Sequence, residues 1–183
     1  MDQKRINGEK RLVMQLRKAL PAEFDQVKAF YWDLIDQMKD RSNTVGWKKG
    51  IYPSDLFLKE SISSGTLYLL DSTDGYIASV ILNHSWNEGY DGLPWSIDCK
   101  RNDILVPHAL AVKPDVQRTG IGKLVVKDII EIAGSENIIT IRLDILGGNT
   151  AAEILYTKAG FQYVAAKDMF MKIPAGQNMS CMN

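Results

Sequence analysis

Hydrophobic residues in the first part of the chain follow strand-like and then helical spacing. They alternate with polar residues over positions 11–18, a pattern typical of a half-buried strand. They recur every three or four positions over 21–41, which predicts an amphipathic helix that begins at Pro21. Ser54 is a suitable N-cap for a second helix, and Gly65 is a suitable end for it. This part of the chain therefore predicts one strand followed by two helices.

The pattern then changes from a hairpin to alternating strands and helices. Two β-rich runs, 66–70 and 76–83, flank the dipeptide Asp74-Gly75, which is typical of a hairpin turn, and a polar stretch over 84–102 predicts a loop with a short strand. The later strands are predicted at 104–112, 138–146, 161–165 and 169–173, with helices at 119–133 and 150–159. The hairpin implies antiparallel pairing, and the strand–helix–strand order implies parallel pairing with right-handed crossovers. The prediction is therefore an α/β (α+β) fold with a mixed sheet.

Composition and charge restrict the class of protein. The chain has 183 residues, of which 45% are hydrophobic and 24% charged, so we predict one globular domain over 1–174 and a frayed tail over 175–183. The 22 basic and 22 acidic residues cancel to a net charge of 0, which argues against a nucleic-acid partner. Cys99 and Cys181 are too few for a disulfide framework, and no apolar run approaches the roughly 20 residues of a membrane span. We therefore expect a cytoplasmic protein with no membrane or metal partner, and its assembly state stays open, with a homodimer as one option.

The segment 113–123 joins a predicted strand to a predicted helix and carries glycine at alternate positions, Gly120 and Gly122. A helix N-terminus presents unpaired N–H groups and the positive end of the helix dipole, which together bind phosphate. Glycine lets the backbone approach an anion without interference from a Cβ atom. Arg118 and Lys123 add local positive charge to a chain that is neutral as a whole. The segment is therefore a candidate phosphate site, although a Gly-x-Gly pair on its own more often starts an ordinary surface helix.

Two nucleotide-binding motifs do not fit this segment. The phosphate loop of NTPases needs a hydroxyl residue after its lysine, and Leu124 follows Lys123 here. The dinucleotide fingerprint needs a third glycine, and Val125 stands at that position. Both nucleotide alternatives are therefore set aside.

Two blocks of residues between His108 and Phe161 accompany the glycine segment. The first is Ala109-Leu-Ala-Val-Lys-Pro114 with Gln117-Arg-Thr-Gly-Ile-Gly122, and the second is Asn149 with Ala152, Leu155-Tyr156 and Gly160-Phe161. Together they resemble the GCN5-related N-acetyltransferase (GNAT) superfamily, because Gln-x-x-Gly-x-Gly is similar to its pyrophosphate loop and the second block is similar to its second cofactor block. The resemblance implies the GNAT fold, in which acetyl-CoA lies in a V between two splayed parallel strands, here 104–112 and 138–146.

The resemblance also implies acetyl-CoA (CoA) as the cofactor and assigns residues to it. The backbone of Leu110 and Val112 would pair with the pantetheine amides like an added strand. Asn149 would bond the cofactor arm, and the alternative is that it is a helix N-cap. Thr150 with Glu153 makes a better capping box, which would leave Asn149 freer for the ligand. The expected cofactor residues are Leu110, Ala111, Val112, Gln117, Arg118, Thr119, Gly120, Ile121, Gly122, Lys123, Asn149 and Tyr156.

Two catalytic residues are expected from the same resemblance. Tyr156 stands where the family has the general acid that protonates the CoA sulfur, and the alternative is a core tyrosine beside Leu155. His108 begins a run that resembles the arylalkylamine acetyltransferase branch, where a histidine relays the amine proton, and the alternative is a packed strand residue. The rival bases are water, His84, Glu88, Asp91 and Asp98.

Aromatic and acidic residues gather over 86–95, where they could surround a cationic amine, with 47–52 as the opposite wall. The expected substrate residues are Tyr52, Trp86, Glu88, Tyr90, Asp91 and Trp95. An equally weighted alternative is that these aromatic rings anchor a loop to the sheet.

Two functions follow from the resemblance. The first is an acetyl-CoA-dependent N-acetyltransferase, which transfers an acetyl group to a primary amine of a small molecule or peptide by direct attack in a ternary complex. The alternative is a non-catalytic acyl-CoA-binding sensor or interaction module that keeps the same fold.

Overall fold

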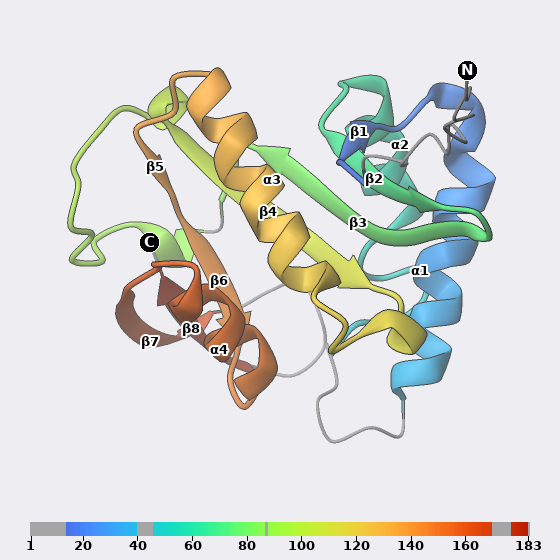
Figure 1. The fold of residues 1–183 in the computed structure, drawn as a ribbon. Helices are drawn as coiled ribbons and strands as arrows, with labels where there is room; N and C mark the ends of the chain where they lie inside the picture. Colours follow the sequence, from blue (N-terminus) through green and yellow to red (C-terminus); the bar gives the residue numbers. More distant parts are fainter. Residues whose placement is uncertain (1–13, 40–45, 87, 170–176, 183) are drawn as a thin grey trace, which may run out of the picture.

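The computed structural model describes residues 14–39, 46–86, 88–169 and 177–182, which form two β-sheets and four α-helices (Figure 1). The helices are α1 (Phe24–Met38), α2 (Asp55–Ser63), α3 (Ile121–Ser135) and α4 (Thr150–Lys158). The strands are β1 (Arg17–Lys18), β2 (Leu67–Ser72), β3 (Gly75–Asn83), β4 (Ile104–Val112), β5 (Thr140–Ile141), β6 (Leu143–Leu146), β7 (Tyr163–Met169) and β8 (Gln177–Met182). Short 3-10 helices are η1 (Pro21–Glu23), η2 (Glu88–Tyr90), η3 (Arg101–Asp103) and η4 (Pro114–Val116). None of the described helices is long and apolar enough to cross a membrane.

The larger sheet has the strand order β1-β2-β3-β4-β5 and is mixed. Strands β1 to β4 pair antiparallel with their neighbours, and β4 pairs parallel with β5. The turn between β2 and β3 contains Asp74 and ends at Gly75, which has a φ of +106° that favours glycine. The smaller sheet, β6-β8-β7, is antiparallel. The predicted hairpin and the predicted mixed α/β fold are therefore confirmed.

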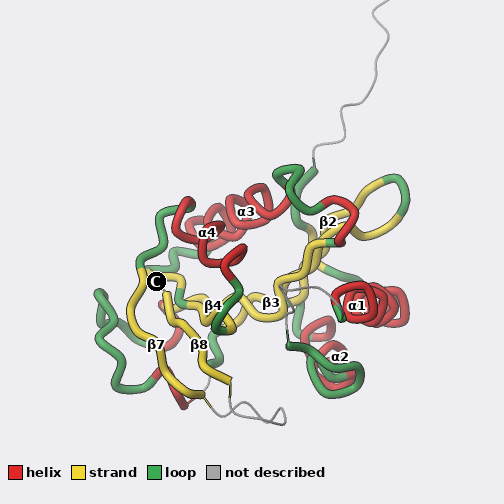
Figure 2. The backbone as a smooth tube through the Cα atoms, turned by 90° about the horizontal axis from the view of Figure 1, so that it is seen from below, coloured by secondary structure: helices red, strands yellow, loops and turns green. Residues whose placement is uncertain are grey.

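The helices lie in two layers, with α1 and α2 on one side of the sheets and α3 and α4 on the other (Figure 2). On the first side Tyr31 and Leu58 pack in one core cluster with Leu69. On the second side Val125 packs in another cluster with Leu70. Neighbouring residues of β2 thus point to opposite faces, and both faces are buried, which explains why the central strands are nearly continuous apolar runs.

Strand β4 carries a bulge at its centre. It pairs with β3 at Ala111–Ser79 and again at His108–Ile81, so β4 has one more residue than β3 between these pairs. Ala109 lies in the bulge with a φ of +48°, which is uncommon for a residue other than glycine. The bulge therefore interrupts the regular ladder midway along the strand.

Strands β4 and β6 diverge where the two sheets meet. Strand β4 pairs with β5 at Ile104–Thr140 and Leu105–Ile141, after which the chain continues into β6, which pairs with β8 instead. Figure 1 shows β4 and β6 running apart from this point. Among the described residues no strand pairs with this edge of β4 beyond Leu105, so the geometry is the V that was expected.

Tyr31 of α1 bonds the bulge of β4. Its buried hydroxyl donates to the carbonyl of Ala109 at 2.8 Å and lies 3.0 Å from Ser79 Oγ. We expect Tyr31→Phe to lower the free energy of unfolding by about 1–3 kcal/mol, since the buried carbonyl loses its partner. Urea denaturation measures this loss. Ser79→Ala is the matched control, because it keeps the bond to Ala109 and should cost less. A loss in Tyr31→Phe no larger than in Ser79→Ala would show that the bond to the bulge is unimportant.

The first elements differ from the prediction at their boundaries. Strand β1 comprises only Arg17 and Lys18 of the predicted strand, and residues 11–13 lie outside the described residues. Helix α1 ends at Met38, and positions 40–41 also lie outside them. The predicted cap is confirmed, because Ser54 Oγ accepts the N–H of Phe57 at the start of α2.

Three later segments also differ from the prediction. In the described part of 84–102 there is no strand, and the backbone there is irregular apart from η2 and the start of η3. The predicted strand 138–146 is divided into β5 and β6, which belong to different sheets. Instead of a frayed tail over 175–183, residues 177–182 form β8 between β6 and β7. Pairing on both sides supplies the order that this short polar segment does not indicate by itself.

Candidate active site

The unpaired edge of β4 presents backbone groups inside the V. The N–H of Lys113 donates to the carbonyl of Ile77 at 2.8 Å, so the backbone of Lys113 faces β3. Backbone groups alternate in direction along a strand, which turns the N–H of Val112 toward the unpaired edge. The carbonyl of Val112 accepts from Gln117 Nε2 at 3.0 Å. The N–H of Val112 is therefore a candidate donor to a ligand, while Gln117 closes the following loop onto β4.

The loop between β4 and α3 has an open, glycine-dependent shape. Arg118 has a φ of +65° and Gly120 has a φ of +97°. Thr119 Oγ1 donates to the carbonyl of Val116 at 2.6 Å and fixes the turn. A Cβ atom at Gly120 would meet no described atom within 4 Å, so the space beside it is open. Because the first turn of α3 leaves its N–H groups unpaired, this loop is a candidate anion site.

Gly122 has a packing role that the sequence did not indicate. A Cβ atom there would lie 3.3 Å from Leu155 Cδ2 of α4. Glycine at this position therefore lets α3 and α4 approach closely. Gly122, the second glycine of the motif, therefore allows a close contact between two helices, whereas Gly120 lies beside open space.

Asn149, and not Thr150, caps α4. Asn149 Oδ1 accepts the N–H of Ala152 at 3.2 Å, and Asn149 is the N-cap residue of the helix. This corrects the expectation that a capping box of Thr150 and Glu153 leaves Asn149 free. Two N–H donors remain on Asn149 Nδ2, because only its oxygen is used by the cap.

Tyr156 of α4 is buried, with 7% of its surface exposed, and packs edge-on against Phe161 at 5.3 Å between ring centroids. Burial raises the pKa of Tyr156 well above its usual range, and the negative charge of Asp144 raises it further. The hydroxyl therefore keeps its proton at neutral pH, as a general acid requires.

His108 of β4 has a defined hydrogen position. Its Nε2 lies 2.9 Å from the carbonyl oxygen of Ser85 and 3.0 Å from Asn83 Oδ1. Because a carbonyl oxygen only accepts, Nε2 carries the hydrogen and Nδ1 holds the lone pair of the neutral ring. Burial lowers the pKa of His108, while the charge of Asp144 and the bond to Ser85 raise it. The neutral ring can therefore accept a proton at Nδ1.

Asp144 of β6 acts on the pKa of both His108 and Tyr156, and it was not among the residues predicted from the sequence. Its Oδ1 accepts from the hydroxyl of Tyr90 at 2.6 Å. Its charge also acts on the titration of His108, Tyr52 and Tyr156. Burial raises the pKa of Asp144, and the hydrogen bond from Tyr90 and the charge of His108 oppose that rise. One signal could have found this residue, because an acidic side chain interrupts the otherwise apolar strand β6.

One aromatic wall reaches the site from the segment before α2. The ring of Tyr52 lies 5.8 Å from that of Trp47 and 5.9 Å from that of Phe57, centroid to centroid. The ring of Phe57 then meets His108 edge-on at 6.2 Å. The expected wall over 47–52 is therefore connected to His108 through the ring of Phe57.

The second aromatic wall is formed by Trp86, Tyr90 and Trp95. Both tryptophan rings contact Tyr90, at 6.4 Å and 5.2 Å between centroids, and these side chains line part of a pocket of about 380 Å³. Arg101 lies over Trp86 at 4.0 Å and Arg142 over Trp95 at 4.6 Å. Cations of the chain itself thus occupy one face of each tryptophan, and Tyr90 is buried against both tryptophan rings.

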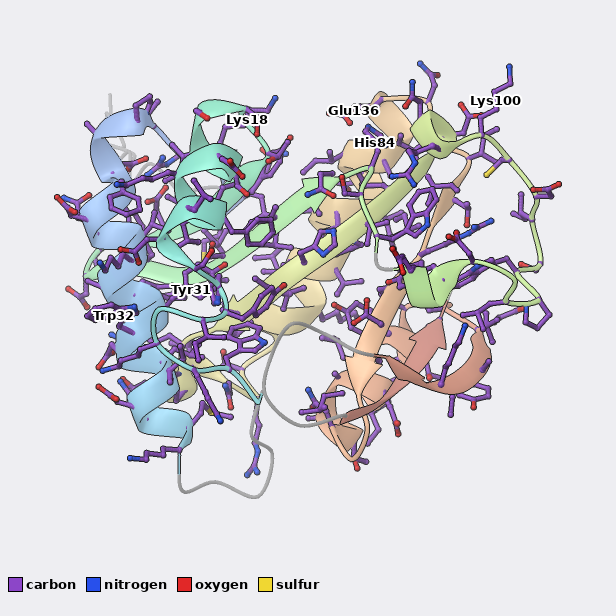
Figure 3. The ribbon with its side chains drawn as sticks, turned by 180° about the vertical axis from the view of Figure 1, so that it is seen from behind. Lys18, Tyr31, Trp32, His84, Lys100 and Glu136 are labelled. Atoms are coloured by element: carbon purple, nitrogen blue, oxygen red, sulfur yellow. The ribbon has the colours of Figure 1, made fainter. Side chains whose placement is uncertain are left out.

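The rival bases lie elsewhere. His84 Nδ1 bonds the carbonyl of Ile104 at 2.7 Å, so His84 lies at the start of β4, apart from Tyr31 beneath the bulge (Figure 3). The side chains of Glu88, Asp91 and Asp98 are exposed, and Asp91 accepts from Trp86 Nε1 at 3.2 Å. The charge of Asp144 therefore acts on His108 and Tyr156, whereas the exposed Asp91 and Asp98 line the pocket beside Trp86, Tyr90 and Trp95.

A mixed sheet whose central strands diverge, with an anion loop before α3 and a buried tyrosine on α4, is the architecture of an acetyltransferase. Residues 63–163, more than half of the 183-residue chain, match the acetyltransferase (GNAT) domain family. The chain belongs to the GNAT superfamily and is an acetyl-CoA-dependent N-acetyltransferase. No curated protein sequence matches it.

Solved structures of GNAT proteins share this fold. A GNAT-family acetyltransferase from Streptococcus agalactiae superposes with a TM-score of 0.75 and 19% identity, over 93% of this chain and 94% of that chain. The ribosomal-protein-alanine N-acetyltransferase from Brucella melitensis has a TM-score of 0.65 and 16% identity, over 92% and 98%. The phosphinothricin acetyltransferase from Sinorhizobium meliloti, solved with acetyl-CoA, has a TM-score of 0.66 and 15% identity, over 93% and 87%. These likenesses concern the fold and leave the acceptor undetermined.

Proposed function

We propose that the protein acetylates a primary amine of a small molecule or peptide by direct attack within a ternary complex. The supporting observation is that β4, which carries His108, diverges from β6, which carries Asp144, and that the charge of Asp144 acts on the pKa of both His108 and Tyr156 of α4. In the proposal His108 supplies the proton acceptor and Tyr156 the proton donor, and Asp144 acts on the pKa of both. Acetyl-CoA supplies the activated acetyl group when it is bound.

His108 acts as the base in this proposal. Its Nε2–H is held by Ser85 and Asn83, so the ring can take the amine proton only at Nδ1. The N–C bond of the amide forms at the acetyl carbonyl as the C–S bond breaks. Tyr156 gives its hydroxyl proton to the departing sulfur and is reprotonated, through solvent, by the proton that His108 took from nitrogen, so that one proton passes from nitrogen to sulfur overall.

The residues proposed to hold acetyl-CoA fit that ligand in two respects. The space beside Gly120 is open, so a phosphate could approach the backbone there. The N–H of Val112 is turned toward the unpaired edge of β4, where it would be able to donate a hydrogen bond to a carbonyl oxygen of the ligand. The proposed set is Leu110, Ala111, Val112, Gln117, Arg118, Thr119, Gly120, Ile121, Gly122, Lys123, Asn149 and Tyr156. Within it, Gln117 and Gly122 act through the shape of the loop, and Asn149 acts through Nδ2.

Tyr156→Phe tests the proposal. We expect kcat to fall about 10²-fold, at the low end of the range for general acids, because a thiolate leaves more readily than an alkoxide. Thiol release from acetyl-CoA, measured over a panel of polyamines, arylalkylamines, aminoglycosides, amino acids and short peptides, is the assay. CoA affinity is the internal control and should stay within about threefold, since the ring is kept. Unchanged thiol release with an active amine would remove the acid role from Tyr156.

A further inference from the structure

Arg142, between β5 and β6, places a positive charge in a buried position. The residue is 7% exposed, and none of the ion pairs among the described residues includes it. Its Nη2 donates to the carbonyl of Ile97 at 2.5 Å, whereas its Nε is buried and has no hydrogen-bond partner in the described part of the chain. A buried charge is costly to desolvate unless it is paired. The guanidinium of Arg142 therefore lacks the anionic partner that its burial favours.

The guanidinium lines a pocket of about 380 Å³, which Ile104 at the start of β4 also lines. Leu143 packs in the core with α3 and α4, whereas Arg142 lies over the ring of Trp95, at 4.6 Å from the ring centroid. The ring covers one flat face of the guanidinium, so the N–H groups in its plane remain available to a planar acceptor. Among the described residues Nη1 has no hydrogen-bond partner, and unlike Nε it is not buried. Arg142 can therefore donate into the pocket from Nη1 and from the second N–H of Nη2.

The other charged residues of this pocket favour a single negative charge in the ligand. Arg101, the second cation, lies over the ring of Trp86 at 4.0 Å. Asp91 and Asp98 are the two anions, and neither forms an ion pair with another described residue. Their charges would repel a doubly charged phosphate, whereas a carboxylate needs only one guanidinium, to which both of its oxygens can bond. The pocket therefore suits a carboxylate better than a phosphate.

We propose that this pocket binds the carboxylate of an organic acid and that Arg142 pairs with it. The rings of Trp86 and Trp95 form apolar walls, which suit an acid with an apolar or aromatic body. Tyr90 connects the pocket to the divergent strands, because it lines the pocket and its hydroxyl donates to Asp144 of β6. The carboxylate can thus belong to the acceptor of the proposed reaction or to a separate ligand, and the two sources differ in their kinetics.

Calorimetry of the full chain with phenylacetate and with phenylacetamide tests the proposal. The two probes have similar shape, and only phenylacetate is charged at pH 7. We expect phenylacetate to bind tighter by roughly 10- to 100-fold, and Arg142→Gln to abolish that difference without weakening phenylacetamide. Lys127→Gln is the matched control, because it removes one positive charge from an exposed position of α3, and it should leave both affinities unchanged. Equal binding of the two probes by the wild type, or a difference that persists in Arg142→Gln, would overturn the proposal.

Asp98→Asn tests the same pocket without altering the buried arginine, so it decides the question even where Arg142→Gln does not fold. Asp98 is exposed and lines the pocket. Loss of its negative charge should tighten phenylacetate by about 2- to 5-fold and leave phenylacetamide unchanged. Inorganic phosphate should displace phenylacetate from the wild type only weakly. An unchanged phenylacetate affinity in Asp98→Asn, or displacement by phosphate at the concentration at which acetate displaces it, would contradict a carboxylate pocket.

Steady-state kinetics with an amine that gives thiol release distinguish the two sources of the carboxylate. If the carboxylate belongs to the acceptor, phenylacetate should raise the KM of that amine without changing kcat. If it belongs to a separate ligand, phenylacetate should leave this KM unchanged. Either pattern is consistent with the pocket, which stands or falls on the binding of the two probes. Because that binding needs no turnover, absence of thiol release with every amine would reject the proposed function alone.

Discussion

His108→Ala is expected to lower kcat/KM by roughly 10²–10⁴-fold, because the neutral Nδ1 is the proposed acceptor of the amine proton. In the wild type, kcat/KM should rise with pH along a limb that lies below the usual histidine value of about 6.5, since burial lowers the pKa of His108. The limb rises with pH because only the unprotonated ring can accept a proton. This limb should be absent from the variant, and pH profiles of thiol release measure both effects.

His84→Ala is the matched control for this experiment, because His84 bonds the carbonyl of Ile104 and lies at the start of β4. It should keep the wild-type limb. CoA affinity should be unchanged in His108→Ala, since the imidazole is not part of the anion loop. A small loss of rate with the limb intact would transfer the role to Glu88, Asp91, Asp98 or water. In Asp144→Asn the limb should move to still lower pH, because the charge that raises the pKa of His108 is removed.

Gly120→Asp should abolish the rise in melting temperature that CoA produces in the wild type. A ligand that binds only the native state stabilises it by mass action, so the loss of that rise reports the loss of binding. Gly120 has a φ of +97°, where a side chain is strained, and an aspartate would place a negative charge beside the expected pyrophosphate. Thermal unfolding with and without CoA measures the effect.

Two further variants separate charge from backbone strain at this position. Gly120→Ala adds the strain alone and should weaken CoA less than Gly120→Asp does. Gly134→Asp adds the same charge later in α3, where a Cβ atom meets no described atom within 4 Å, and should leave the CoA shift unchanged. A folded Gly120→Asp protein with wild-type CoA affinity would remove the phosphate role from this loop.

Much of the fold could be predicted from local patterns. Strand β4 was predicted with the bounds that the structure has, because its apolar run lies between clear loop signals. The division of 138–146 into β5 and β6 could not be predicted, since hydrophobic spacing does not reveal which neighbour a strand takes. Strand β8 was missed for the same reason, because its order comes from β6 and β7 on either side.

The candidate site was predictable where residues act through the backbone or through a local motif. Gly120 and Tyr156 belong to short motifs, so their neighbourhood along the chain was informative. Asp144 has no such motif, and its relation to His108 and Tyr90 exists only once three distant segments meet. The sequence predicts Thr150 as the cap of α4, because Thr150 and Glu153 match the capping-box pattern. The helix begins one residue earlier than that pattern implies, and Asn149 is its N-cap.

Gly122 in the first turn of α3 lies close to Leu155 of α4. This contact holds the start of α3, and the loop before it, against the helix that carries Tyr156. If the loop before α3 holds the pyrophosphate and Tyr156 protonates the sulfur, as proposed, this helix contact sets the distance between the two ends of the donor arm. A donor with a longer or shorter arm between pyrophosphate and sulfur would then fit the hydroxyl less well, even when its phosphates bind. Lengthening the acyl chain leaves that span unchanged. Under this proposal, selection by arm length and selection by acyl length would be independent of each other.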